Sequence, residues 1–344
     1  MAFSFGFAGD DVDGDDTESG AVYASPWTIG NGFGSAPAEE HTLDDLLATL
    51  PDRLSYSTVT IESPIGRILH LPRRELYDVR VQLMAEDDAD KDDTLSDLST
   101  SDIRTGVYEG GFKTWECSLD LASLLLDRGP RKDIDELVRC DQIVELGCGT
   151  AIPTLVLFQH ALQNSIPLTF TLQDYNASVL RLVTLPNLLL TWAAYTSKPI
   201  LDLTSHPQGD LDLTPSVLSA FHSDLTTLQI DLKCLSGSWS LNLAKMIPAS
   251  APEMGTLLLG AETIYSPAAT QAFVEILIIL LKRVKMAKAM LAAKRLYFGV
   301  GGSVDGLKEA CRDGGAVAYE IENHGVPGMK EGGVGRALVE VQMY

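Results

Sequence analysis

The chain lacks paired cysteines. Its five cysteines are scattered, and none forms a Cys-x-x-Cys pair: Cys117, Cys140, Cys148, Cys234 and Cys311. Disulfide frameworks and zinc sites use even numbers of cysteines or closely spaced pairs. Both are therefore disfavoured, no metal site is expected, and a reducing compartment suits the chain.

Long apolar runs are also missing. No stretch of 18 uninterrupted apolar residues occurs, and no basic segment precedes an apolar core near residue 1. A membrane-spanning helix or a secretory signal would need such features. We expect an intracellular protein without a membrane partner. Its hydrophobic content of 45% is ample for a core.

Basic residues are few, and the imbalance is concentrated in the first part of the chain. Residues 1–100 hold 21 acids and 6 bases, whereas residues 101–344 hold 26 acids and 20 bases. Acidic runs at 10–16 and 86–93 are typical of solvated, disordered chain. The functional alternative is attraction of a basic partner, and the negative sign disfavours direct DNA binding.

One glycine turn lacks the features of two common nucleotide sites. The apolar run that ends at Leu146 passes directly into Gly147-Cys148-Gly149. A dinucleotide fingerprint needs a third glycine three residues later, and a P-loop needs a following lysine. Neither is present, so NAD and ATP are disfavoured.

The pattern that remains indicates S-adenosylmethionine. Glu145-x-Gly147-x-Gly149 follows one strand-like run, and a second such run ends at Asp174. Glycines without a Cβ let backbone N–H groups approach a ligand, at the strand ends where open α/β sheets bind nucleotides. Asp174 is placed to bind the two ribose hydroxyls. The glycine turn alone is a weak signal, and the acid at the second strand end strengthens it.

Alternating strands and helices predict a parallel sheet with helices on both faces, preceded by a small α+β extension. We expect an acidic, mostly disordered segment at 1–40, the extension with its acidic linker at 41–100, and the main domain at 101–344 with a loop-rich insertion near 191–226. The predicted strands are 56–61, 79–83, 142–146, 168–173, 228–234, 256–261, 295–300, 316–321 and 336–342. The predicted helices are 43–50, 152–163, 177–190, 267–284 and 304–312. The last two strands predict a terminal antiparallel hairpin.

Residues 104–344 resemble the protein-histidine N-methyltransferases, and residues 3–7 resemble fungal members. The motifs that carry the resemblance are Gly110-Gly111-Phe112-Lys113-Thr114-Trp115-Glu116, Gln173-Asp174-Tyr175-Asn176, Gly237-Ser238-Trp239-Ser240 and Gly260-Ala261-Glu262-Thr263-Ile264-Tyr265. The first and last of these are the specific ones. Ala261 departs from the serine that relatives often carry, which puts a hydroxyl contact there in doubt.

The resemblance implies a class I methyltransferase fold with a seven-stranded sheet. It implies transfer of a methyl group from S-adenosylmethionine to a histidine ring nitrogen of a basic large-subunit ribosomal protein, by a monomer in the cytoplasm and nucleus. The expected cofactor-binding residues are Lys113, Trp115, Glu145, Gly147, Gly149, Asp174, Asn176, Gly237, Trp239 and Ala261. The expected catalytic residues are Glu262 and Tyr265.

The chemistry explains why a carboxylate is expected. Neutral imidazole, with an ordinary pKa of about 6.5, already carries a lone pair near pH 7, so alignment matters more than a strong base. A carboxylate on the other ring N–H would fix the tautomer and stabilise the developing imidazolium. Glu262 is the first candidate, because Asp174 is assigned to the ribose.

Each of these residues has a structural alternative. Trp115, Trp239 and Tyr265 are also plausible packing residues, Lys113 a surface lysine, and Asn176 a helix N-cap. A cluster of bases between Lys282 and Arg295 is interpreted as a solvated helix face, with contact to a phosphate or to ribosomal RNA as the alternative. A lysine or small-molecule methyltransferase and a catalytically silent cofactor-binding module stay open as alternative functions.

Overall fold

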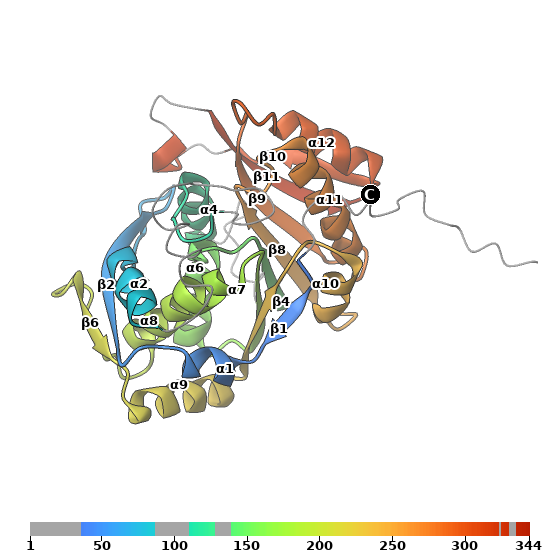
Figure 1. Ribbon diagram of the computed structural model, residues 1–344. Helices are drawn as coiled ribbons and strands as arrows, with labels where there is room; N and C mark the ends of the chain where they lie inside the picture. Colours follow the sequence, from blue (N-terminus) through green and yellow to red (C-terminus); the bar gives the residue numbers. More distant parts are fainter. Residues whose placement is uncertain (1–35, 87–109, 128–138, 323–324, 330–334) are drawn as a thin grey trace, which may run out of the picture.

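The computed structural model describes residues 36–86, 110–127, 139–322, 325–329 and 335–344. Its centre is an eight-stranded sheet in the order β1-β7-β5-β4-β8-β9-β11-β10 (Figure 1). The strands are β1 (Glu39–His41), β4 (Cys140–Leu146), β5 (Leu168–Asp174), β7 (Ile230–Ser236), β8 (Gly255–Ala261), β9 (Lys288–Lys294), β10 (Ala316–Glu320) and β11 (Arg336–Met343). The five strands β7, β5, β4, β8 and β9 pair in parallel.

The strand directions confirm the expected α/β class and the terminal hairpin. β11 pairs antiparallel with both β9 and β10. The seven strands from β7 to β10 make up the expected sheet, and β1 adds an antiparallel edge strand on β7. That edge strand begins within the segment 1–40 that was expected to be mostly disordered. Residues 3–7, 10–16 and 87–93 lie outside the described residues.

Helices cover both faces of the sheet, because neighbouring residues on a buried strand point to opposite sides. Ile143 belongs to one core with α4, α6, α8 and α9, whereas Val144 belongs to the other with α10, α11 and α12. The helices are α4 (Glu116–Leu126), α6 (Ile152–Asn164), α7 (Ala177–Val179), α8 (Leu185–Tyr195), α9 (Pro215–Leu228), α10 (Leu241–Met246), α11 (Pro267–Leu281) and α12 (Val304–Asp313). A π-helical turn, η1 (Leu180–Thr184), joins α7 to α8, and a 3-10 turn, η2 (Pro327–Met329), precedes β11.

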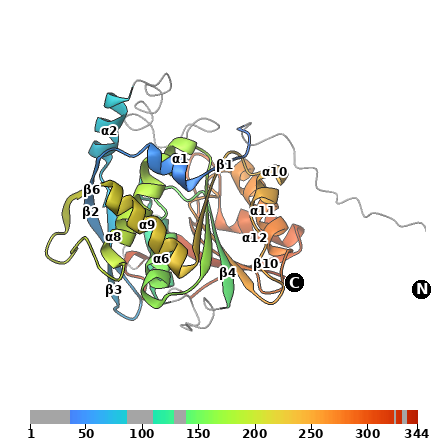
Figure 2. The ribbon, with the colours of Figure 1, turned by 90° about the horizontal axis from the view of Figure 1, so that it is seen from below.

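The extension forms a second, three-stranded antiparallel sheet in the order β3-β2-β6. Its elements are α1 (Leu43–Ala48), β2 (Arg53–Glu62), β3 (Ile68–Arg74), α2 (Leu76–Ala85) and β6 (Gln208–Asp212). β6 comes from the insertion at 191–226, so two distant segments share this sheet, which lies against α6 and α8 (Figure 2). The extension is therefore packed on the main domain.

The expected strand at 79–83 is wrong, because this segment is part of α2. Val79 and Leu83 are buried one helical turn apart, whereas Val81 between them is exposed. A strand would place all three on one face. The alternation of apolar and polar residues in this segment was therefore not the sign of a strand.

The strand expected at 295–300 is also wrong. β9 occupies Lys288–Lys294 instead, with a buried run of alanine, methionine and leucine between the two lysines. Alanine is depleted in strands, so this central strand has a weak sequence signal. The following residues include Gly299 at a φ of 84°, which an extended strand does not adopt. Lys288 and Lys294 are thus strand residues and not part of a helix face.

The insertion at 191–226 is more regular than expected. Besides β6 it contains most of α9, whose first turn is capped by Thr214 accepting from the Val217 N–H. Pro215 sits at the first helical position, where a missing N–H costs nothing. The expected loop-rich insertion therefore contains a regular helix.

One helix in the described residues is long and apolar enough to cross a membrane by length and composition, the continuous stretch Ala177–Tyr195. Of its most apolar window, 83% is buried inside the fold. It therefore has the burial of a core helix.

Candidate active site

A cavity of about 250 Å³ opens at the carboxyl ends of β4, β5, β8 and β9. Its lining includes every residue predicted for the site except Asn176, together with Ser118, Gln173, Tyr175, Thr263, Lys294, Tyr297 and Val300 among others. Four strands and the segment 110–118 thus converge on one site. Asn176 lies at the N-cap of α7, makes no side-chain capping bond there, and uses its N–H to bind the Asp174 carboxylate.

The glycine turn shapes one wall of the cavity. Gly147 and Gly149 have φ values of 66° and 50°, the left-handed region that favours glycine. A Cβ on Gly149 would lie 3.1 Å from the Gly111 carbonyl oxygen, and one on Gly147 would lie 3.2 Å from the Thr263 methyl group. Larger residues at these positions would displace the segments that close the cavity.

Asp174 is buried behind this turn. Its Oδ2 accepts the Gly149 N–H at 2.9 Å and its Oδ1 accepts the Asn176 N–H at 3.1 Å. These bonds fix the carboxylate at the end of β5, at the cavity wall. The predicted acid is therefore in place.

Gln173 is a site residue that sequence reasoning missed. Its amide Nε2 donates to the Gly237 carbonyl at 2.9 Å, and its Oε1 accepts from Gly147 N at 3.2 Å and Trp239 Nε1 at 2.8 Å. One side chain thus ties the glycine turn to the β7 loop and orients the Trp239 ring. The only sequence signal was its place beside Asp174.

Glu145 lies under the turn and is fully buried. Burial raises its pKa to about 8, although the Thr154 N–H and hydroxyl both donate to its Oε2 and oppose the rise. Thr154 is in the first turns of α6, so Glu145 joins β4 to that helix.

The segment 110–115 covers the turn from the opposite side. Trp115 Nε1 donates to the Gly110 carbonyl at 2.9 Å, which closes a compact loop. Thr114 Oγ1 donates to Thr150 Oγ1 at 3.2 Å and accepts from Arg73 Nη1 at 3.3 Å. The small sheet therefore contributes to holding this wall.

Glu262 has an unusual backbone and an unusual side-chain environment. It directly follows β8 with a φ of 59°, a left-handed conformation that costs a non-glycine residue about 1–3 kcal/mol. Within the described chain, its Oε1 is buried and has no hydrogen-bond partner, and Lys294 Nζ lies 3.7 Å from it. Strain of this kind is typical of functional sites.

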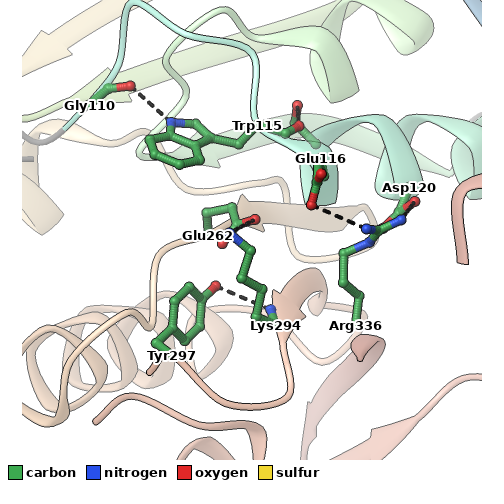
Figure 3. A network of polar contacts seen from close by, with 9 residues as sticks. Gly110, Trp115, Glu116, Asp120, Glu262, Lys294, Tyr297 and Arg336 are labelled. Carbon is green, nitrogen blue, oxygen red and sulfur yellow. Dashed lines mark hydrogen bonds and ion pairs between the residues drawn. The ribbon is translucent and has the colours of Figure 1, made fainter. Parts of the chain in front are cut away.

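Lys294 and Tyr297 complete this end of the cavity, and sequence reasoning missed both. Figure 3 shows Glu262 beside Lys294, with Trp115 on one side and Tyr297 on the other. Lys294 Nζ is 5.5 Å from the centre of the Trp115 ring and 5.9 Å from that of Tyr297, within the range of cation–π attraction. Burial, with the Glu262 carboxylate second, raises the pKa of Tyr297 above its ordinary value, so its hydroxyl stays protonated.

The remaining predicted residues are also placed. Lys113, Gly237, Trp239, Ala261 and Tyr265 line the cavity. Trp239 stacks edge-on against Phe273 of α11 at 5.2 Å, so it packs on the core and faces the site at once. Tyr265 is 7% exposed.

Comparison with known proteins places this site in a family. The chain is 41% identical over 274 residues to "Histidine protein methyltransferase 1" of Schizosaccharomyces pombe, covering 78% of this chain and 76% of that protein. It is 36% identical over 343 residues to the protein of the same name from Saccharomyces cerevisiae, covering 88% and 89%. The chain belongs to the histidine protein methyltransferase 1 family.

No protein-family model matches the chain. Among solved structures, an S-adenosylmethionine-dependent methyltransferase from Clostridium acetobutylicum is similar at 10% identity and a TM-score of 0.38, over 65% of this chain and 91% of that one.

As a member of the histidine protein methyltransferase 1 family, the chain is an S-adenosylmethionine-dependent protein-histidine methyltransferase, and its residues fit the cofactor. Glycines at 110, 111, 147, 149 and 237 line the cavity without side chains, which leaves room for a ligand against the backbone. A Cβ on Gly111 would lie 3.2 Å from Asp174 Oδ2, where it would crowd this acid. Glycine backbone without side chains, a buried carboxylate and a tryptophan ring held by a hydrogen bond are suited to binding a nucleoside.

Proposed function

We propose that this methyltransferase modifies a histidine of a basic large-subunit ribosomal protein, acting as a monomer in the cytoplasm and nucleus. Two features support this substrate. The curated relatives are named for histidine as the acceptor, and the net charge of −21 favours a basic partner. The ribosomal substrate itself is what the resemblance of the motifs to the protein-histidine N-methyltransferases implies.

The cofactor half of the site is assigned to the glycine turn and its neighbours. Asp174 holds the ribose hydroxyls, Gly147 and Gly149 present backbone to the nucleoside, and Trp239 packs beside it. We assign Lys113 and Trp115, which line the same cavity, to the methionine end, where the Lys113 ammonium can meet the cofactor carboxylate. When bound, S-adenosylmethionine supplies an electrophilic methyl group on a sulfonium.

The acceptor half consists of Glu262, Lys294, Trp115 and Tyr297. The single observation that carries the histidine assignment is the buried Glu262 Oε1, which lies in this cavity with Lys294 Nζ 3.7 Å away and has no hydrogen-bond partner within the described residues. An imidazole N–H can satisfy that oxygen, which leaves the other ring nitrogen free as nucleophile. Trp115 and Tyr297 offer faces on either side of a flat ring, and Tyr265 is a second orienting candidate.

Lys294 favours histidine over lysine as acceptor. A substrate lysine would bring its own ammonium next to Lys294 Nζ and would have to lose a proton before attack. Neutral imidazole needs no such step near pH 7. A silent cofactor-binding module would leave the strained backbone of Glu262, and its buried Oε1 without a hydrogen bond in the described residues, without a purpose.

Large-subunit ribosomal proteins from cells that lack this enzyme provide the test. We expect incubation with the protein and S-adenosylmethionine to add one methyl group to a histidine in one of them, located by peptide mass spectrometry. A matched incubation with small-subunit proteins should stay unmodified. Methylation confined to other proteins, or absent from every ribosomal protein, would contradict the proposed substrate.

A further inference from the structure

The loop after β9 displays apolar side chains to solvent. Leu296 is 43% exposed, Phe298 74% and Val300 54%, whereas Tyr297 between them is 8% exposed. Alternate side chains therefore point outward around a buried anchor. Displaying three apolar residues within five positions is costly unless something covers them.

The loop is held in one shape by backbone hydrogen bonds. The Tyr297 N–H donates to the Gly302 carbonyl at 2.8 Å, and the Gly301 N–H donates to the Tyr297 carbonyl at 2.9 Å. Gly299 and Gly301 take left-handed φ values of 84° and 86°. The apolar surface therefore has a defined shape before any substrate binds.

The same loop is fastened to the catalytic segment. The Gly302 N–H donates to the Tyr265 carbonyl at 3.2 Å, and a Cβ on Gly302 would lie only 2.0 Å from the Ile264 carbonyl oxygen. Tyr297 and Val300 line the active-site cavity itself. The exposed surface is therefore continuous with the site that receives the histidine.

We propose that Leu296, Phe298 and Val300 bind an apolar side chain of the acceptor polypeptide next to its target histidine. This inference rests on the proposed function, because it takes a polypeptide as substrate. A chain that delivers a histidine into the cavity must pass its rim, and residues of an extended chain follow at about 3.3–3.6 Å each. A neighbour within a few positions of the histidine therefore reaches Phe298.

The position of this surface separates two tasks. Glu262 and Lys294 act on the ring inside the cavity, whereas the exposed Leu296 and Phe298 contact the flanking sequence. The acidic balance of the enzyme attracts many basic proteins, and a fixed apolar contact selects among them. Sequence specificity is then a property of the 296–300 loop.

Two synthetic basic peptides test the inference. Each holds one histidine, flanked in one peptide by leucine and in the other by serine. We expect Phe298→Ser to raise KM for the leucine peptide about tenfold or more, the effect of losing much of one apolar burial, with little change in kcat. Phe298→Leu should restore most of the binding. The serine peptide should bind weakly to wild type and variant alike.

Tyr77→Ser is the matched control, because Tyr77 of α2 is an aromatic residue with 60% exposure that does not line the cavity. It should leave KM for both peptides unchanged. Equal effects of Phe298→Ser on both peptides, or none on either, would overturn the inference. The inference would also be overturned if light scattering showed that Phe298→Ser changes the oligomeric state, since the loop would then join two copies of the chain.

Peptide binding should also be measured by calorimetry with S-adenosylhomocysteine bound, where no methyl transfer occurs. Failure of the proposed function would leave this binding difference intact while wild type modifies no ribosomal protein. Failure of the inference would leave methylation intact while the binding difference is absent.

Discussion

At the scale of single residues, Glu262 carries the account of the reaction. It is a buried carboxylate with a left-handed backbone, one oxygen without a hydrogen-bond partner, and Lys294 beside it. The left-handed backbone and the oxygen without a hydrogen bond both cost folding stability. They are what an acceptor for an imidazole N–H requires, and the sequence predicted the residue from its motif but not its partner.

Glu262→Gln should slow methyl transfer about 10²-fold or more and leave S-adenosylmethionine affinity nearly unchanged, because only the charge opposite the developing imidazolium is lost. Single-turnover kinetics with a histidine peptide and calorimetry for the cofactor measure the two effects. Glu116→Gln, nearby but with an exposed side chain, is the control. A wild-type rate for Glu262→Gln would make this carboxylate structural and move the ring contact to Tyr265.

Lys294→Met should shift the acid side of the pH–rate profile to higher pH. Lys294 faces Glu262, Tyr297 and Trp115. Cys117 of α4 lies next to Glu262. The nearby acids of α4, Asp120 and Glu116, form ion pairs with Arg336 of β11. Without the ammonium, the Glu262 charge is less balanced, which raises the pKa of a bound imidazole and protonates the nucleophile sooner. Lys294→Arg should keep the wild-type profile. Unchanged profiles in Lys294→Met would show that the lysine is only a packing residue.

Glu145→Gln should stabilise the cofactor-free protein increasingly as pH rises. In the folded chain burial raises the pKa of Glu145 to about 8 from an ordinary value of 4.5. The stability linked to its protonated form is complete below the lower pKa and is lost as pH rises through the higher one. The melting-temperature difference between variant and wild type should therefore grow from about pH 5 to about pH 9. Exposed Glu253→Gln should show no such trend, and parallel curves for Glu145→Gln would refute the burial argument.

At the scale of elements, the small sheet and the helix α8 hold the cofactor wall. Asn187 of α8 accepts the Arg74 N–H at 2.8 Å and donates to the Thr150 carbonyl at 3.0 Å, so it links β3 to the glycine turn. The side chain of Arg74 is itself buried and bonded to Asp78, Gln82 and the Leu182 carbonyl. The extension therefore supports the site mechanically.

Asn187→Ala should lower the free energy of unfolding by about 2 kcal/mol or more, because two buried backbone groups lose their partners. It should also weaken S-adenosylmethionine binding, since Thr150 adjoins the turn. Thr191→Ala, one helical turn later, is the control: its buried hydroxyl has no partner within the described residues. Denaturant unfolding and calorimetry measure both effects. Normal cofactor affinity in a destabilised Asn187→Ala would separate the extension from the site.

The elements also show what a sequence can predict. β4 and β5 were predicted because each is a short run with regularly placed apolar residues that leads into an informative residue, and the glycine turn and Asp174 followed from them. β9 and α2 were not, because an alanine-rich strand and a half-exposed helix carry misleading local patterns. Lys294 and Tyr297 were missed as a result, since both depend on where β9 ends. Gln173 was missed because its three hydrogen bonds join segments distant in sequence.

At the scale of the whole molecule, the proposals assign three successive steps of substrate recognition. In this proposal the net negative charge attracts a basic protein, the 296–300 loop binds its flanking residue, and Glu262 orients the ring. The charge imbalance was evident from composition. The continuity of rim and cavity required the three-dimensional structure.

The most direct test of the central claim is the identity of the methylated amino acid. Wild-type protein, Gly147→Arg and Glu262→Gln should each be incubated with isotope-labelled S-adenosylmethionine and a basic histidine-containing substrate, followed by hydrolysis and amino-acid analysis. We expect labelled methylhistidine with wild type, none with Gly147→Arg because the arginine fills the cofactor cavity, and strongly reduced label with Glu262→Gln. Label recovered as methyllysine, or equal methylhistidine from all three proteins, would contradict the assignment of this site.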